Sequence, residues 1–229
     1  IAEEIRKRED EFVQTIVQEQ GKIKELAIGE VQGAANYFDY TAEWARRIEG
    51  EIVTSDSPNE NIFIFKIPMG VVSGILPWNF PFFLIARKVA PALVTGNTIV
   101  IKASEETSNN AFLFSQILKK IDLPRGVVNF VYGQGPTVGK QLSSNKKIDM
   151  IRFTGSVETG SAIMGEAAKN ITKVNLELGG KAPALVLADA DIDLAVSKIR
   201  DARIINSGQV CNCVERVYVD RKIVDEFTD

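Results

Sequence analysis

The feature that most constrains the fold is a regular alternation of short apolar runs and helical segments from residue 70 onward. The runs "GVVSGIL", "TIVIK", "GVVNFVY" and "IDMIRF" have the length and the β-branched content of buried strands, and short turns join them to the helical segments. Strands that alternate with helices in this way form a parallel sheet with helices on both faces. The sequence therefore predicts an α/β protein with a doubly wound, mostly parallel sheet.

The first 68 residues have a different pattern. Residues 2–28 carry apolar positions at helical spacing and predict one or two amphipathic helices, broken near Gly21, and residues 30–49 predict another helix. A polar turn then separates two apolar runs, which predicts a β-hairpin over residues 51–68. The pattern leaves two interpretations of this hairpin: an arm used for oligomerisation, or an edge hairpin of the same core.

Composition excludes several classes of function. The 229 residues include no histidine, which removes Ser-His-Asp and Cys-His catalysis and histidine-based metal sites, and we expect no metal. The net charge of −3 does not suit nucleic acid. No apolar run is long enough to cross a membrane and the charged N-terminus is unlike a signal peptide, so we expect a cytoplasmic protein. The missing initial methionine and the unfinished helix at the end predict a fragment.

Two turns between a strand and a helix contain glycines that let the backbone approach a phosphate. Gly133, Gly135 and Gly139 follow one predicted strand, and Gly155 with Ser156 follows the next. Exposed N–H groups at the start of the following helix favour an anion, so a cofactor with a pyrophosphate would fit. The first loop is one residue longer than the usual fingerprint, and simple turn glycines remain the alternative.

The strand "TIVIK" ends in Lys102, with Glu105 three residues later. A carboxylate at the end of a strand in a nucleotide-binding sheet accepts the two hydroxyls of the adenosine ribose and repels a 2′-phosphate, which favours NAD over NADP. The alternative is a carboxylate that interacts with the dipole of its own helix.

The segment "NSGQVCNC" contains the two cysteines of the chain, Cys211 and Cys213. A thiol with an ordinary pKa is only slightly ionised at neutral pH, so a catalytic cysteine needs a positive or hydrogen-bonding environment. From the residues alone, a buried and inert cysteine is the better interpretation of either one.

Four motifs together carry a resemblance to a known family. The segments "PWNFPFFLIARKVAPALVTGNTIVIKASE", "FTGSVETG", "LELGGKAP" and "NSGQVCNC", in this order and at these separations, resemble the aldehyde dehydrogenase superfamily. The resemblance covers essentially the whole chain. Within the superfamily, "PFFLIARK" and "GQVCNC" look most like bacterial lactaldehyde and glycolaldehyde dehydrogenases. It implies oxidation of a small hydroxyaldehyde to the acid with NAD, through a thiohemiacetal and a thioester on a cysteine.

The resemblance also implies roles for single residues. Cys211 is the nucleophile and Cys213 is not; Glu177 is the general base that activates the hydrolytic water, and Asn79 donates to the oxyanion. Arg87 is a candidate for hydrogen bonding to a 2-hydroxyl or a carboxylate, with a solvated surface arginine as the alternative. From their spacing, Phe80, Phe83, Leu84 and Arg87 would share one face if residues 81–95 form a helix, and we expect Phe80, Phe83 and Arg87 to contact the substrate. The implied cofactor contacts are Leu76, Pro77, Trp78, Lys102, Ser104, Glu105, Gly135, Phe153, Thr154, Gly155, Ser156 and Leu178.

The same resemblance implies a domain organisation and leaves rival functions open. Residues 1–50 would be N-terminal helices of a Rossmann-like NAD-binding domain over 69–180, residues 51–68 an oligomerisation arm, and residues 181–229 the start of an incomplete catalytic domain. We expect a homodimer or homotetramer for the complete chain. The alternatives are a non-catalytic fragment that binds the cofactor and an aldehyde dehydrogenase that transfers the acyl group to CoA. An enzyme that transfers the acyl group to CoA would not need Glu177 as a base, because no water has to be activated.

Overall fold

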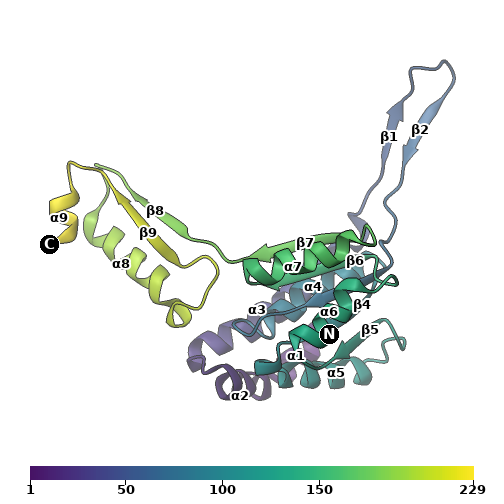
Figure 1. Ribbon diagram of the computed structural model, residues 1–229, viewed down its shortest axis with the longest axis horizontal. Helices are drawn as coiled ribbons and strands as arrows, with labels where there is room; N and C mark the ends of the chain where they lie inside the picture. The colour runs from purple at the N-terminus through teal and green to yellow at the C-terminus, as the bar shows by residue number, and fades with distance from the viewer. The chain divides into compact units, whose positions relative to one another are not determined.

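A parallel sheet of five strands lies at the centre of the first part of the chain (Figure 1). The computed structural model describes residues 1–229 and divides them into two compact units, Ile1–Leu176 and Glu177–Asp229. The sheet of the first unit has the order β5-β4-β3-β6-β7, and the pairs from β5 to β6 are parallel. Its strands are β3 (Val71–Ile75), β4 (Thr98–Lys102), β5 (Val128–Val131), β6 (Met150–Gly155) and β7 (Lys173–Leu178). The α/β prediction is confirmed.

The order of the strands reverses once. The chain runs outward from β3 through β4 to β5, then returns to the other side of β3 to form β6 and β7. In a doubly wound sheet, the carboxyl ends of the two strands at such a reversal form a natural crevice for a ligand. The reversal places this point between β3 and β6.

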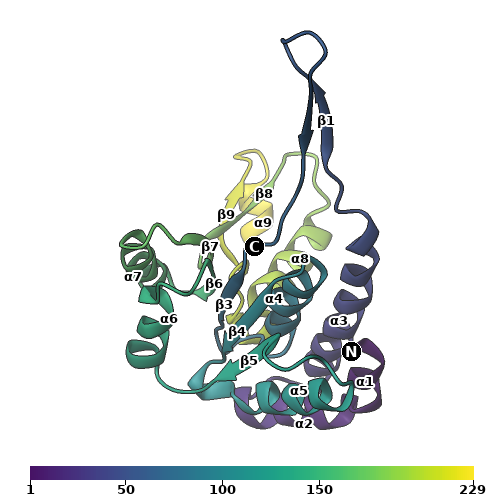
Figure 2. The same ribbon diagram turned by 90° about the vertical axis from the view of Figure 1, so that its right-hand side faces the viewer.

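Helices cover both faces of the sheet, as Figure 2 shows with the sheet seen from its edge. The helices α4 and α5 lie on one face with the three N-terminal helices packed on them, and α6 and α7 lie on the other. The buried core includes Phe12, Phe82, Phe114, Ile99 and Ile101, which join the N-terminal helices, α4 and α5 to the sheet. The helices are α1 (Ala2–Lys7), α2 (Glu9–Gln20), α3 (Lys24–Ala42), α4 (Phe83–Val94), α5 (Asn109–Lys120), α6 (Lys140–Ser144) and α7 (Val157–Ala168).

The N-terminal boundaries differ from the sequence prediction. The break near Gly21 is confirmed, because this glycine has φ +74° and ends α2 in the left-handed conformation. The next helix, however, begins at Lys24 and ends at Ala42, where a short 3-10 turn over Glu43–Arg46 follows. The expected helix over 30–49 was therefore too late at both ends, since the apolar pattern continues into the 3-10 turn and does not mark the end of the α-helix.

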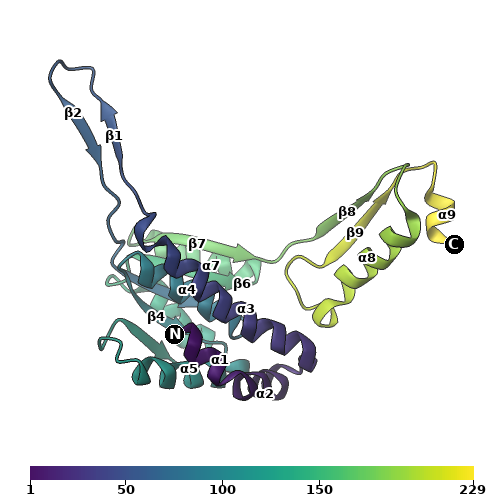
Figure 3. The same ribbon diagram turned by 180° about the vertical axis from the view of Figure 1, so that it is seen from behind.

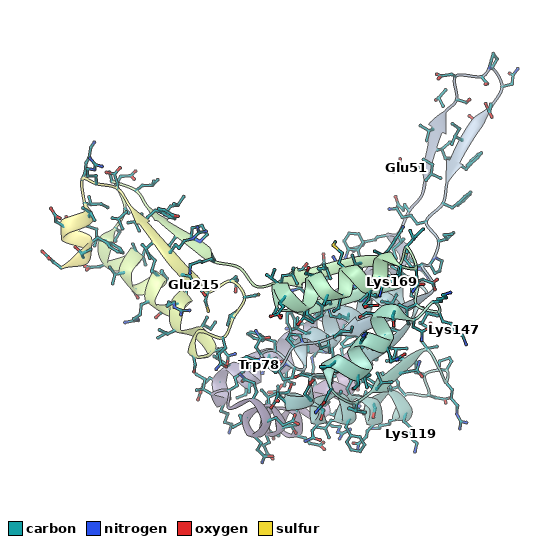
Figure 4. All side chains as sticks on the ribbon, in the orientation of Figure 1. Glu51, Trp78, Lys119, Lys147, Lys169 and Glu215 are labelled. Carbon is teal, nitrogen blue, oxygen red and sulfur yellow. The ribbon has the colours of Figure 1, made fainter.

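The predicted hairpin is present as a separate two-stranded antiparallel sheet. It consists of β1 (Glu51–Thr54) and β2 (Asn61–Ile64), with Thr54 opposite Asn61 and Glu51 opposite Ile64. Figure 4 shows its side chains, with Glu51 labelled at the start of β1. Every residue of both strands is exposed, including Phe63 at 57%.

The second unit is a small βαβ element followed by a short helix (Figure 3). Its strands pair in parallel, with Leu185 opposite Tyr218, as a crossover through the intervening helix allows. Its elements are β8 (Ala182–Val186), α8 (Ile192–Ile204), β9 (Val214–Val219) and α9 (Val224–Thr228). No helix of the structure combines the length and the apolar composition that crossing a membrane requires.

Candidate active site

The carboxyl ends of four neighbouring strands bring most of the predicted cofactor contacts of the first unit to one edge. Ile75 at the end of β3 is opposite Lys102 of β4 and Phe153 of β6, and Lys102 is in turn opposite Val131 of β5. The segments that begin at Leu76, Ala103, Tyr132 and Thr154 therefore leave the sheet side by side. This edge includes the reversal between β3 and β6, where a ligand is expected.

Lys102 and Glu105 form one cluster with the first glycine loop. The Lys102 side chain is buried, and its Nζ lies 2.5 Å from Oε2 of Glu105, whose side chain is 43% exposed. The backbone N–H of Gly135 donates to Oε1 of the same carboxylate at 3.2 Å. The Lys102 ammonium, and then the N–H groups of Glu105 and Gly135, hold the pKa of the Glu105 carboxyl below its ordinary value. A carboxylate is thus fixed at the sheet edge with part of its surface open to solvent.

The remaining contacts at this edge have local structural roles as well. Ser104 Oγ accepts from the N–H of Glu106 and so caps the 3-10 turn that carries Glu105. Ser156 Oγ accepts from the N–H of Thr159 at the start of α7. Gly155 lies against the ring of Phe153, where a Cβ would come within 2.3 Å of Cζ. The position favours glycine, because any side chain there would have to displace this buried ring.

Asn79 lies in the loop that joins β3 to α4. The loop begins with Leu76, which is buried, and Pro77, which is half-buried; Trp78 is 41% exposed and is labelled in Figure 4. Asn79 is half-buried, and its carbonyl accepts a hydrogen bond of 2.8 Å from Nζ of Lys22.

The predicted substrate residues do not all lie on the helix that the sequence suggested. Because α4 begins at Phe83, Phe80 belongs to the preceding loop, where its ring lies 3.7 Å from Nζ of Lys22. Phe83 is half-buried, with its ring at an edge contact of 5.9 Å to Tyr37. Arg87 is on the helix and exposed. Phe83 thus contributes to the core, whereas the side chain of Arg87 remains accessible.

Sequence reasoning missed Lys88. This lysine is only 3% exposed, and its Nζ donates to Oγ1 of Thr154 at 2.9 Å. The aliphatic part of the Lys88 side chain lies against Gly74 of β3, where an added Cβ would be 3.3 Å from the lysine Cδ. The cluster places a buried amine near the carboxyl ends of β3 and β6. The available signal was a lysine directly before the apolar run "VAPALV", inside the segment predicted to be helical.

Cys211 and Cys213 have opposite environments in the second unit. Cys211 is exposed, whereas Cys213 is 3% exposed with its Sγ 4.0 Å from the carbonyl of Ile205. Asn206 and Ser207, with φ +49° and +56°, follow α8 in the left-handed conformation, and Gly208 has φ +76°. These residues turn the chain, so α8 ends at Ile204. Two non-glycine residues in this conformation store strain, which occurs most often next to functional groups.

Glu177 and Leu178 are the last two residues of β7 and belong to the second unit. Glu177 is exposed and Leu178 is half-buried. The glycines that follow include Gly180, where a Cβ would lie 3.6 Å from the carbonyl of Cys211. The loop after the predicted base and the loop of the predicted nucleophile are therefore neighbours within this unit. Asn79 and the cofactor edge belong to the first unit.

The comparison with known proteins decides the family, since residues 1–229 match the Aldehyde dehydrogenase family throughout. The chain belongs to the aldehyde dehydrogenase family. It is 63% identical over 225 residues to lactaldehyde dehydrogenase of Escherichia coli (strain K12), which covers 98% of this chain and 47% of that protein. D-glyceraldehyde dehydrogenase (NADP(+)) of Thermoplasma acidophilum is 43% identical over 223 residues, 97% of this chain and 45% of that protein.

Solved aldehyde dehydrogenase structures agree with the fold. The crystal structure of lactaldehyde dehydrogenase from Escherichia coli matches 99% of this chain and 48% of its own, with a TM-score of 0.97 and 62% identity. The chain spans about half the length of the curated relatives that it matches. The resemblance predicted from the four motifs is confirmed, and with it the Rossmann-like architecture of an aldehyde dehydrogenase.

Proposed function

We propose that the full-length protein oxidises a short aldehyde to the carboxylic acid with NAD, and that Cys211 is the nucleophile. The observation that carries this proposal is the contrast between the two thiols: Cys211 is exposed just after the strained turn at Asn206 and Ser207, and Cys213 is buried. A nucleophile has to reach a substrate, so only Cys211 has a suitable position. Membership of the aldehyde dehydrogenase family supports this choice of chemistry.

The residues at the sheet edge fit a nicotinamide dinucleotide. The Glu105 carboxylate is held open to solvent by Lys102 and Gly135, so it is available to accept the two ribose hydroxyls. Ser156 and Gly155 at the start of α7 would hold the pyrophosphate, because N–H groups at a helix start favour an anion. When bound, the cofactor accepts a hydride from the substrate carbon. The carboxylate would repel a 2′-phosphate, which favours NAD, although one relative is named for NADP(+).

The chain's own residues support the covalent chemistry as follows. The Cys211 thiolate attacks the aldehyde carbon, forms a carbon–sulfur bond and moves the carbonyl electron pair onto oxygen. The Asn79 amide and the backbone N–H of Cys211 donate to that oxyanion, and one such donor typically contributes about a hundredfold to a thousandfold in rate. After the hydride leaves, a thioester remains on Cys211. Glu177 removes a proton from water, which attacks the thioester and releases the acid and the thiol.

A short hydroxyaldehyde is the substrate class that the residues favour. Arg87 is exposed on α4 four residues beyond Phe83, so its guanidinium is free to meet a polar substituent of the aldehyde. A 2-hydroxyl or a carboxylate would accept from it. The relative with 63% identity is named a lactaldehyde dehydrogenase, which supports the same class.

The test uses the full-length protein with NAD and lactaldehyde or glycolaldehyde, and follows the absorbance of the reduced cofactor. We expect Cys211→Ala to abolish turnover and Cys213→Ala to retain it, apart from a loss of stability. Turnover that survives Cys211→Ala would rule out the covalent mechanism. The absence of turnover in the unmodified protein would favour the non-catalytic alternative.

A second experiment distinguishes hydrolysis of the thioester from transfer of its acyl group to CoA. We expect Glu177→Gln to let the thioester form but to slow its hydrolysis by about a hundredfold or more, because water then lacks a base. A burst of reduced cofactor followed by slow turnover would be the signature. If CoA restored full turnover in this variant and raised it in the unmodified protein, the acyl-transferring alternative would replace our proposal.

A further inference from the structure

Lys22 and Glu30 form an ion pair that is fully buried. Both side chains are 0% exposed, and Nζ of Lys22 lies 2.5 Å from Oε2 of Glu30. Lys22 precedes α3 by two residues and Glu30 is on its second turn. Burial lowers the pKa of the Lys22 amine, and the carboxylate of Glu30 opposes this effect. Removing two charges from water is costly, so such a pair is weak evidence for added stability and raises the question of another role.

The other hydrogen bonds of the pair converge on one short segment. Nζ of Lys22 donates to the carbonyl of Asn79 at 2.8 Å and lies 3.7 Å from the centroid of the Phe80 ring. Oε1 of Glu30 accepts from the N–H of Phe82 at 2.8 Å and of Phe83 at 3.1 Å. The pair thus holds the main chain on both sides of the Phe80-Pro81 step.

The segment has a physical need for these contacts. The first N–H groups of a helix have no partner within the helix, and Phe82, the residue before α4, has no side chain that accepts a hydrogen bond. The Glu30 carboxylate supplies this cap from another helix, with the charge that the start of a helix favours. The ring of Phe82 stacks on Phe12 at 4.2 Å and fixes the same point from the other side.

We propose that Lys22 and Glu30 are positioning residues for Asn79, which fix its main chain so that its side-chain amide is presented to the oxyanion. The inference rests on the proposed function, in which Asn79 is the oxyanion donor. The carbonyl of Asn79 is held at one end of the loop and the start of α4 at the other, so few main-chain rotations remain between them. A donor displaced by about 1 Å loses on the order of a hundredfold in rate, which makes such positioning consequential.

The test is a double-mutant cycle in the full-length protein. The chosen variant is Lys22→Met with Glu30→Gln, because the glutamine still accepts from Phe82 and neither residue is left as an unpaired buried charge. Of the contacts with residues 79–83, this variant removes the hydrogen bond to the Asn79 carbonyl and the contact of Nζ with the Phe80 ring. We expect the single-turnover rate of hydride transfer to fall by about tenfold to a hundredfold, with the KM for the aldehyde changed by less than about threefold. In an Asn79→Ala background, the same pair of substitutions should lower the rate by less than about twofold, because the donor is already absent.

Two outcomes would overturn the inference. One is an unchanged rate of hydride transfer in the Lys22→Met, Glu30→Gln variant. The other is that this pair of substitutions lowers the rate by the same factor in the Asn79→Ala background as in the unmodified protein. Failure of the proposed function is separate, since it would appear as an unaltered rate in Asn79→Ala alone. Lys120→Met is the matched control, because it removes an ion pair of 2.5 Å with Glu4 on the surface and should leave the rate unchanged. Glu30→Ala, which also removes the cap of α4, should lose more activity than Glu30→Gln if the pair positions the loop, and an equal loss would count against it.

Discussion

The Glu105 carboxylate shows how one residue links local structure to the candidate cofactor site. Its pKa is lowered chiefly by Lys102, so its charged form is stabilised in the folded state. Such a group contributes stability above its unfolded pKa, near 4.5, and loses it as the pH falls through the lower folded value. The same charge that stabilises the turn is the one that would accept the ribose hydroxyls.

We expect Glu105→Gln to lower the free energy of unfolding at about pH 7 by no more than about 1 kcal/mol, because the side chain is 43% exposed and solvent screens the pair. The difference from the unmodified protein should shrink as the pH falls below 4.5. Thermal melts over this pH range measure it, with Glu106→Gln, the exposed neighbour, as the control. A difference that does not change with pH would show that the ion pair is not its cause.

A second residue, Arg87, should determine the selectivity for the aldehyde. We expect Arg87→Leu to lower kcat/KM for lactaldehyde by about tenfold or more relative to propanal, because a hydrogen bond from a charged group to the hydroxyl is lost. Kinetics on the two substrates provide the measurement. Equal losses on both would rule out recognition of the hydroxyl. Arg125→Leu, an exposed arginine outside α4, should leave the ratio of the two unchanged.

At the scale of elements, the start of β3 depends on a turn that only glycine satisfies. Gly70 has φ +118°, and a Cβ there would lie 2.2 Å from Oδ2 of Asp149, the atom that accepts from the N–H of Val71. The N–H of Gly70 donates to Asn97 at 2.9 Å. The start of the central strand β3 is therefore hydrogen-bonded to Asn97 and Asp149, the residues directly before the two neighbouring strands β4 and β6.

We expect Gly70→Ala to destabilise the protein by about 1 to 3 kcal/mol, through backbone strain and the loss of the contact with Asp149. Gly29→Ala is the matched control, because Gly29 is inside α3 with nothing within 4 Å of a new Cβ. That change should stabilise by about 0.5 to 1 kcal/mol, since alanine favours the helix. Urea unfolding of the two variants would contradict the argument if Gly70→Ala were neutral.

At the scale of the whole molecule, the hairpin exposes a series of large apolar side chains. Phe63, Phe65 and Ile67 are 57%, 78% and 82% exposed in this chain. Exposed apolar surface of this kind is typical of an interface, which supports the prediction that the hairpin is an oligomerisation arm. Its assignment as an arm, like the domain boundaries expected from the resemblance, remains a prediction.

We expect Phe63→Asp with Ile67→Asp to shift the full-length protein toward a lower oligomeric state, because charges would have to be buried at the interface. Sedimentation velocity provides the mass, and circular dichroism shows whether the fold is retained. Phe112→Asp, which alters an aromatic residue of α5 that is 53% exposed, is the control and should not change the mass. An unchanged mass in the hairpin variant would count against its use as an oligomerisation arm.

The sequence by itself determined the order and type of most elements, because apolar periodicity and turn residues are local. The alternating strands and helices after residue 70, the hairpin and the break at Gly21 all follow from neighbours in the chain. The four motifs determined the family, since each keeps its residues at fixed spacing. Helix ends were less predictable, as at Ile204, because the left-handed turn there uses Ser207, which has no preference for that conformation, as well as Asn206, which adopts it more readily.

Only the tertiary structure decided which side chains meet. Lys88 reaches Thr154 across the sheet, and Lys22 with Glu30 holds the loop of Asn79 from another helix. It also separated the two cysteines, leaving Cys211 exposed and Cys213 buried. These contacts join residues that are tens of positions apart, and the local pattern of polar and apolar residues does not predict such pairs. The burial of a lysine becomes visible only in the folded structure. A buried amine needs hydrogen-bonding partners, and only folding brings those partners to it.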